Sequence, residues 1–130
     1  MVGSGWWFCC NRNSNDTDLA TQIRNGTMKM DDYQLAATAF AQYDDIMYPV
    51  ASLMVESAEL ADLFIKPMLR GDNVEWSRSD IVKEAGDVLW NLSLILRDNE
   101  ITLSEVAVAN IHKLQDRLDR NVIKGSGGNR

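Results

Sequence analysis

Two pairs of acidic residues have types and spacing that could do chemistry. Glu56 and Glu59 form one pair, and Glu84 and Asp87 form the other. Each pair is spaced i, i+3, which places its side chains on one face of an α-helix with Cβ atoms about 5–6 Å apart. Both pairs lie in apolar stretches, where carboxylates are costly unless a cation meets them. Two such helices packed face to face would gather four carboxylates around a hard metal ion such as Mg²⁺.

Acidic pairs at this spacing also occur on solvated helix faces, so either pair alone could be a surface feature. The small residues beside the acids, Ala58, Ala85 and Gly86, favour close packing of the two helices and hence a shared site. Ferritin-like di-iron bundles use Glu-x-x-His pairs, and this chain has a single histidine, His112, and no such pair. An all-oxygen site favours Mg²⁺ or Mn²⁺ over iron, copper or zinc. Because magnesium commonly binds together with substrate phosphates, the pattern indicates chemistry on a phosphate ester or anhydride.

Polar residues near the C-terminus could bind that phosphate. Asn110, Lys113 and Arg117 are spaced i, i+3, i+7, which is one face of a helix. Lysine supplies a point charge and arginine a planar fork, and both suit phosphate oxygens. Ion pairing of Lys113 and Arg117 with neighbouring acids on a solvated surface is the alternative interpretation. Trp90, three residues after Asp87, could stack on a nucleobase or fill the core. The remaining candidates for substrate binding are Lys66, Lys124 and Arg130.

Apolar residues at helical spacing predict the elements that position the first acidic pair. A first helix is expected over about 32–45, with Asp31 and Gln34 forming a capping box at its start. A second helix is expected to begin near Pro49 and to be ended by Pro67 and Gly71. This second helix carries Glu56 and Glu59.

Two further helices are expected to carry the other candidate residues. A third runs from the capping residue Ser77 to about Leu96, is apolar almost all round, and carries the second acidic pair. A fourth begins after Thr102, which is expected to cap it in a capping box with Glu105, and ends near Asn121. We find no convincing strand pattern and no internal repeat. The wide apolar surfaces of the second and third helices predict an all-α fold with a four-helix-bundle-type core that is completed by oligomerisation.

The domain organisation is predicted from composition. At 130 residues the chain fits one domain. Residues 1–27 are rich in Asn, Asp, Thr and Gly and are expected to be an N-terminal extension of loop or disorder. Docking of Trp6 and Trp7 on the domain or on a second subunit is the alternative. The domain itself is expected over 28–130, with a flexible glycine-rich tail over 122–130.

The charge and the cysteines exclude several function classes. A net charge of −6 argues against nucleic acid or an anionic membrane as the main partner. No apolar run approaches the roughly 18 residues that span a bilayer. The two cysteines, Cys9 and Cys10, are adjacent, and with one histidine they support neither a structural zinc site nor a disulfide framework. Two reduced thiols in a cytoplasmic protein are expected.

The motifs together resemble those of the all-α nucleoside triphosphate pyrophosphohydrolases, and they are closest to the MazG-like branch. The resemblance covers about residues 30–130. It departs from the family at Ala58, where glycine is frequent, and at Gly128, where aspartate is usual in the tail. The matching pieces are Glu56-x-x-Glu59, the 24 residues 60–83, Glu84-x-x-Asp87, Asp87-Val88-Leu89-Trp90, Asn110-Ile111-x-Lys113-Leu114-x-x-Arg117 and the terminal Gly125-Ser126-Gly127-Gly128-Asn129-Arg130.

The resemblance implies Mg²⁺-dependent hydrolysis of a nucleoside triphosphate, or its deoxy form, between the α and β phosphates. The products would be the monophosphate and pyrophosphate, consistent with house-cleaning of the nucleotide pool. Glu56, Glu59, Glu84 and Asp87 would hold the metal and serve catalysis, and one of them would act as general base. The resemblance also implies a homo-oligomer, a dimer or a tetramer.

Two alternatives are left open by the sequence. One is a related hydrolase directed to dUTP, dCTP or phosphoribosyl-ATP. The other is a non-catalytic helical oligomer that binds nucleotide or regulates a partner and has kept the acids without turnover. A nucleic-acid binder is a poor third, because the chain has no basic stripe.

Overall fold

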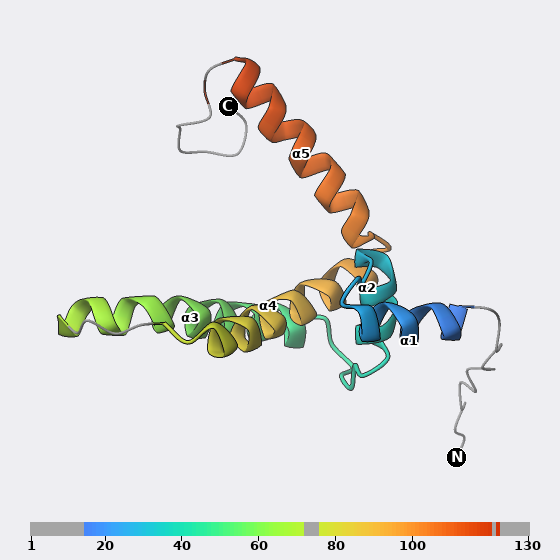
Figure 1. Ribbon diagram of the computed structural model, residues 1–130, viewed down its shortest axis with the longest axis horizontal. Coiled ribbons are helices and arrows are strands. Elements are labelled where there is room, and N and C mark those ends of the chain that lie inside the picture. The colour runs from blue at the N-terminus through green and yellow to red at the C-terminus, as the bar shows by residue number, and fades with distance from the viewer. Residues whose placement is uncertain (1–14, 72–75, 121, 123–130) are drawn as a thin grey trace.

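The helices form a long pair with smaller helices packed at one end. The computed structural model describes residues 15–71, 76–120 and 122. The regular secondary structure of these residues is entirely α-helical. The helices are α1 (Asn15–Asn25), α2 (Met30–Thr38), α3 (Met47–Arg70), α4 (Arg78–Asp98) and α5 (Leu103–Asp119). α3 and α4 lie side by side as an antiparallel pair, and α2 packs against α4 (Figure 1). α5 contacts α2 at its start and then extends away from the other helices (Figure 1). The predicted all-α fold class is confirmed.

The expected caps of the longer helices are largely present. Ser77 accepts a hydrogen bond from the Asp80 amide at the start of α4, and Thr102 accepts one from the Glu105 amide at the start of α5. α3 ends at Gly71, whose φ of 69° is the left-handed conformation that glycine adopts without strain. The prediction that Pro67 ends this helix is wrong, because Pro67 lies inside α3. A proline there removes one backbone hydrogen bond, and the last turn continues to the cap.

The first periodic helix is shorter than expected. α2 ends at Thr38, and not near residue 45. Two side chains of α4 take the carbonyl groups at this end: Trp90 Nε1 donates to the Ala37 oxygen at 3.1 Å, and Arg97 donates to the Thr38 oxygen at 3.1 Å. Carbonyl groups at a helix end need partners from outside the helix. Tertiary contacts with α4 therefore satisfy the end of α2, which the local sequence pattern could not show.

The predicted capping box at the start of α2 is also wrong. Lys29 is the N-cap residue and makes no side-chain cap. Gln34 is buried and clamps the turn between α4 and α5: its Nε2 donates to the Ser93 and Ile101 carbonyl oxygens at 3.3 and 3.0 Å. Its Oε1 accepts the Leu103 amide at 3.0 Å. A buried side-chain amide that satisfies three backbone groups stabilises the fold more than the same amide would as an exposed cap at a helix start.

The structure places a helix, α1, within the segment for which composition predicted loop. The buried Gln22 joins α1 to α2: its Nε2 donates to Asp32 Oδ2 at 2.6 Å, and its Oε1 accepts the Lys29 amide at 2.8 Å. Such contacts between elements can fix a helix that its own composition does not favour. Trp6, Trp7 and the tail over 123–130 lie outside the described residues. The domain boundary near residue 28 stays a prediction.

The described residues bury little apolar surface in a single chain. Among the described residues, Leu94 and Leu103 are the aliphatic side chains that are almost fully buried, whereas Phe40 is 74% exposed and Leu69 is 77% exposed. Exposed apolar surface on this scale is typical of proteins that bind another macromolecule. No helix in the described part of the chain has the length and apolar character needed to cross a bilayer.

Candidate metal centre

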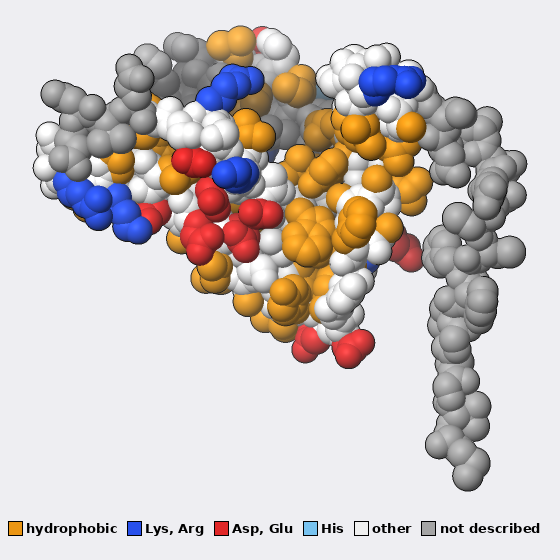
Figure 2. Space-filling view, turned by 60° about the horizontal axis from the view of Figure 1, so that its bottom comes forward, with side chains coloured by type: hydrophobic (Ala, Val, Ile, Leu, Met, Phe, Trp, Pro, Cys, Tyr) orange, Lys and Arg blue, Asp and Glu red, His pale blue; other side chains and the backbone are white. Residues whose placement is uncertain are grey.

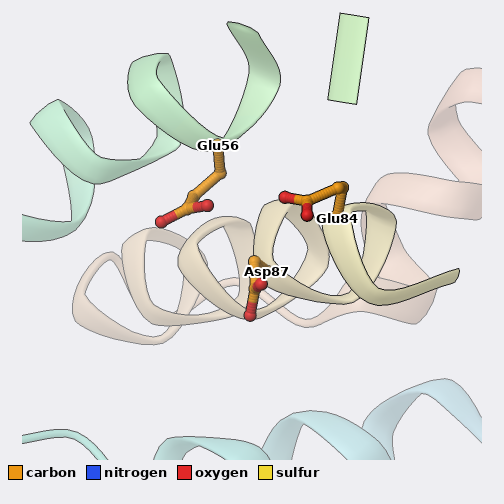
Figure 3. A group of neighbouring side chains, drawn as sticks. All are labelled: Glu56, Glu84 and Asp87. Atoms are coloured by element: carbon orange, nitrogen blue, oxygen red, sulfur yellow. The ribbon is translucent and has the colours of Figure 1, made fainter. Parts of the chain in front are cut away.

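Three of the four predicted acids meet where α3 lies against α4. Glu56 comes from α3, and Glu84 and Asp87 come from successive turns of α4. One carboxylate oxygen from each lies within 4.8 Å of the others. Figure 3 shows Glu56 reaching from α3 toward the helix that carries Glu84 and Asp87. On α4, the i, i+3 spacing places Glu84 and Asp87 on one face, as predicted from the sequence. Packing of α3 against α4 adds Glu56 as the third acid.

Glu59 lies beside this group. It is one turn after Glu56 on α3 and is exposed. Its carboxylate adds negative charge and a side-chain hydrogen bond to Glu56, but its oxygens are not among the three that converge within 4.8 Å. The structure thus separates one acid from the other three.

The electrostatics of the group favour a cation. Burial, followed by the negative charges of Glu59, Asp87 and Glu84, raises the pKa of Glu56 above its usual 4.5. The ion pairs that the described residues form involve other acids, namely Asp62, Asp80, Asp98 and Asp116. Three convergent carboxylate oxygens with unbalanced charge suit a hard divalent cation such as Mg²⁺ or Mn²⁺, which prefers oxygen ligands.

Two polar side chains, Asn91 and Tyr33, lie near Asp87. Asn91 is buried, and its Nδ2 donates to the Asp87 carbonyl oxygen at 3.0 Å. Tyr33 of α2 lies close enough to Asp87 that, after burial, the Asp87 charge further raises the pKa of its hydroxyl. Tyr33 therefore stays protonated near neutral pH and can donate a hydrogen bond.

Trp90 lines an apolar pocket next to the acids. The pocket has a volume of about 360 Å³, and its lining residues are Tyr33, Ala36, Ala37, Phe40 and Trp90. Figure 2 shows a group of acidic side chains that borders a surface of hydrophobic side chains. The sequence pattern predicted Trp90 as a substrate ligand, whereas it did not single out Tyr33 and Phe40, which line the same pocket. Their helical spacing on the first helix is also that of core residues, so only the packing of α2 on α4 distinguishes them.

Lys66 lies in a different part of the α3–α4 pair. It forms an i, i+4 ion pair with Asp62 and lines a hollow of about 340 Å³ together with Trp76 and Asp80. The ring of Trp76 packs against Phe64 with centroids 5.0 Å apart. No contact of Lys66 with the three convergent acids is seen, so its role in substrate binding stays a prediction.

The polar face predicted near the C-terminus lies on α5. Asn110 and Lys113 are exposed, and Arg117 is partly exposed. Because α5 extends away from the α3–α4 pair, a single chain does not bring this face to the acids (Figure 1). Lys124 and Arg130 lie outside the described residues. The roles of all five residues in phosphate binding stay predictions.

Comparisons with known proteins identify the family to which the chain belongs. The family described as MazG nucleotide pyrophosphohydrolase domain matches residues 49–122, the range that holds the four acids and the polar face of α5. The chain is 35% identical over 114 residues to the Gene 37 protein of Mycobacterium phage L5, a match that covers 79% of this chain and 100% of that relative. No solved structure matches the chain significantly. The chain therefore belongs to the MazG nucleotide pyrophosphohydrolase domain family.

Proposed function

We propose that this protein hydrolyses nucleoside triphosphates, ribo or deoxy, between the α and β phosphates in a Mg²⁺-dependent reaction. The products are the monophosphate and pyrophosphate, and the role is removal of unwanted nucleotides from the pool. The observation that carries the proposal is the convergence of Glu56, Glu84 and Asp87 within 4.8 Å in a chain of the MazG family. Such an oxygen-only site suits a metal that binds together with substrate phosphates.

The four acids are proposed to have two roles, metal binding and proton transfer, according to their positions. Glu56, Glu84 and Asp87 would hold Mg²⁺ through their carboxylate oxygens, which converge within 4.8 Å. The ion would supply Lewis-acid chemistry there, lowering the pKa of a water molecule and offsetting the negative charge of the phosphates. Glu59, beside Glu56 but outside the three, is the acid best placed to take the proton of that water as general base. Without a cation, the four acids would repel a triphosphate.

A second copy of the chain is needed to complete the site. α5 exposes Val108, Ile111 and Leu118 along its length while it extends away from its own acids (Figure 1). Burial of these side chains against a partner subunit would remove apolar surface from water. The same assembly would also need to bring Asn110, Lys113 and Arg117, which lie on another face of α5, to phosphates held at a metal centre. We therefore propose a homo-oligomer, either a dimer or a tetramer, in which α5 crosses the interface.

Product identification tests the reaction class. The purified protein is incubated with ribo- and deoxynucleoside triphosphates, with Mg²⁺ or with a chelator, and the products are separated. We expect monophosphate and pyrophosphate, and only when Mg²⁺ is present. Diphosphate and inorganic phosphate would refute the proposed cleavage site. Nucleotide binding by calorimetry without any turnover would favour the non-catalytic oligomer.

Two variants separate metal binding from proton transfer. Glu59→Gln is expected to lower kcat by about 10²-fold or more, the usual contribution of a general base, while Mg²⁺ binding by calorimetry is kept. Glu105→Gln is the matched control, because Glu105 is an exposed acid on α5 with no part in the site. Undiminished activity in Glu59→Gln would remove Glu59 from the mechanism.

A further inference from the structure

We propose that Asn91 is a positioning residue of the metal centre. Its side-chain amide oxygen accepts a hydrogen bond from a water molecule bound to the cation that Glu56, Glu84 and Asp87 would hold. This role rests on the proposed function, because it concerns the same cation. It adds a neutral, buried residue to a site that the sequence pattern assigned to acids alone.

Asn91 carries a buried hydrogen-bond acceptor that the described part of the chain does not satisfy. The residue is 2% exposed, and its Nδ2 donates to the Asp87 carbonyl oxygen at 3.0 Å. Its Oδ1 is the one buried side-chain polar atom among the described residues that has no hydrogen-bond partner. Nearly all buried polar groups have a partner, because an unsatisfied acceptor in the interior is costly. A donor from outside the protein is therefore expected at Oδ1.

The hydrogen bond to Asp87 fixes which end of the amide is left over. The atom that faces the Asp87 carbonyl oxygen at 3.0 Å must be a donor, because two acceptors at that distance would repel each other. The NH₂ end of Asn91 is its only donor, so the other end of the planar amide is the oxygen. The acceptor therefore points away from the α4 backbone at Asp87.

Asn91 lies on the same face of α4 as the acids. It follows Asp87 by four residues and Glu84 by seven, and both spacings place side chains along one helix face. Side chains on a helix lean toward its N-terminus, which for Asn91 is the direction of the two acids. Glu56 of α3 meets this face of α4 (Figure 3). The unsatisfied oxygen is thus carried one helical turn from Asp87, beside the metal centre.

The polar side chains packed around this part of α4 do not supply the donor. The Trp90 indole N–H group donates to a backbone carbonyl oxygen of α2, and Gln34 Nε2 donates to two other backbone carbonyl oxygens. The Tyr33 hydroxyl lies near Asp87 but does not bond to Asn91. Water remains as the donor, and a buried water needs two to four polar partners. A carboxylate-bound Mg²⁺ provides such a water, because it keeps several of its own.

A neighbouring residue shows that the bond to the backbone does not by itself require asparagine. Ser93 is also buried on α4, and its hydroxyl donates to the Leu89 carbonyl oxygen at 2.7 Å, four residues earlier. Asn91 makes a bond of the same kind and carries an additional acceptor. A neutral acceptor can orient a metal-bound water without adding a fourth negative charge to three acids that already repel one another.

Calorimetric titration of the full chain with Mg²⁺ and with Mn²⁺ tests the inference, because it measures affinity for the cation without turnover. Asn91→Leu keeps the size of the side chain and removes the amide. It should weaken binding of both cations by about 10–100-fold, the usual effect of losing a group that orients metal ligands. Asn91→Asp keeps an oxygen acceptor and removes the donor, so it should bind the cations at least as tightly as wild type.

Asn99→Leu is the matched control. Asn99 Nδ2 donates to the Ile95 carbonyl oxygen at 2.7 Å, also four residues earlier, but Asn99 is exposed at the C-terminal end of α4. Its cation affinities should equal those of wild type. Asn91→Ser is the second variant should Asn91→Leu not fold, because a serine hydroxyl can bond to the backbone as Ser93 does. It lacks the amide oxygen, so the same loss of affinity is expected.

Three outcomes overturn the inference. Wild-type affinity in the folded Asn91→Leu or Asn91→Ser variant would show that Oδ1 has no connection with the cation. A loss in Asn91→Asp equal to that in Asn91→Leu would show that the donor end of the amide is the part that matters. No binding of Mg²⁺ or Mn²⁺ by wild type would overturn the role of Asn91 together with the metal centre. Failure of the proposed reaction alone gives a different result, namely cation binding by wild type with no pyrophosphate from any nucleotide.

Discussion

A carboxylate oxygen of Glu56 on α3 lies within 4.8 Å of one on Glu84 of α4. The two helices pack along each other as an antiparallel pair, so this contact between like charges occurs inside the largest interface of the fold. Two carboxylates at such a distance repel unless a proton or a cation intervenes. The helix pair is therefore built at the expense of some stability in the metal-free protein, and binding of a cation should restore that stability.

The first prediction concerns stabilisation by metal. The proposed Mg²⁺ site is assembled in the folded chain and not in the unfolded one, so we expect the melting temperature to rise with Mg²⁺ concentration. At a concentration 100 times Kd, the free energy of unfolding should increase by about 2.7 kcal/mol. Glu84→Gln and Asp87→Asn should abolish the rise, whereas Glu105→Gln should keep it. A melting temperature of the wild type that does not respond to Mg²⁺ or Mn²⁺ would refute the metal centre.

The second prediction concerns the pH dependence of the metal-free protein. Burial, and then the charges of Glu59, Asp87 and Glu84, raise the pKa of Glu56 above 4.5. The folded chain thus holds the Glu56 proton more tightly than the unfolded chain, so stability is lost as the pH rises from 4.5 through the raised pKa. Glu56→Gln cannot ionise at this position, so it does not lose stability in this way as the pH rises. In a chelator, we expect the variant to melt at a higher temperature than wild type at neutral pH.

The same pair of proteins supplies the controls for Glu56. The difference in melting temperature should disappear well below pH 4.5, where Glu56 is protonated in both folded and unfolded chains. Saturating Mg²⁺ at neutral pH should reverse the order, because only wild type keeps all three ligands. A difference that persists unchanged in acid would mean that packing, and not charge, explains the effect.

The third prediction concerns Gln34, which satisfies three backbone groups around the α4–α5 turn. Gln34→Ala leaves the Ile101 carbonyl and the Leu103 amide without this partner in a buried place. We expect a loss of about 3 kcal/mol in the free energy of unfolding, measured in urea. Gln115→Ala removes a single exposed hydrogen bond within α5, to Asp119, and should cost less than about 0.5 kcal/mol. Equal losses in the two variants would contradict the clamp.

The fourth prediction concerns Glu100, the non-glycine residue with positive φ, 58°, in the described part of the chain. It ends α4 in a Schellman-type turn: its amide donates to the Arg97 carbonyl and the Ile101 amide donates to the Leu96 carbonyl, both at 2.9 Å. Glycine adopts this conformation without a Cβ penalty. Glu100→Gly should therefore raise the free energy of unfolding by up to about 1 kcal/mol.

A matched glycine substitution tests the cause of that gain. Glu105→Gly lies inside the first turn of α5 and should lower stability by about 1 kcal/mol, since glycine is a poor helix former. Thermal melts of both variants measure the difference. Destabilisation by both would show that the Glu100 side chain, and not its backbone conformation, determines the stability of this turn.

The features that depend on short stretches of chain could be predicted from the sequence. The caps Ser77 and Thr102, the glycine that ends α3, and the placement of both acidic pairs on helices follow from helical periodicity and local hydrogen bonds. The same reasoning failed at Asp31 and Gln34. Their spacing fits a capping box, but Asp31 accepts the Ser104 amide at 2.9 Å and Gln34 binds the α4–α5 turn.

By itself, the sequence determined that the chain is helical and that four acids with i, i+3 spacing lie on two helices, because these properties depend on neighbours within a turn. Only the tertiary structure decided that Glu56, Glu84 and Asp87 converge while Glu59 lies beside them. It also decided that α2 packs beside Trp90 to form an aromatic pocket. It decided, too, that α5 extends away from the acids on α3 and α4. These relationships join residues far apart in the chain, and they depend on how helix faces pack, which the spacing within one helix does not specify.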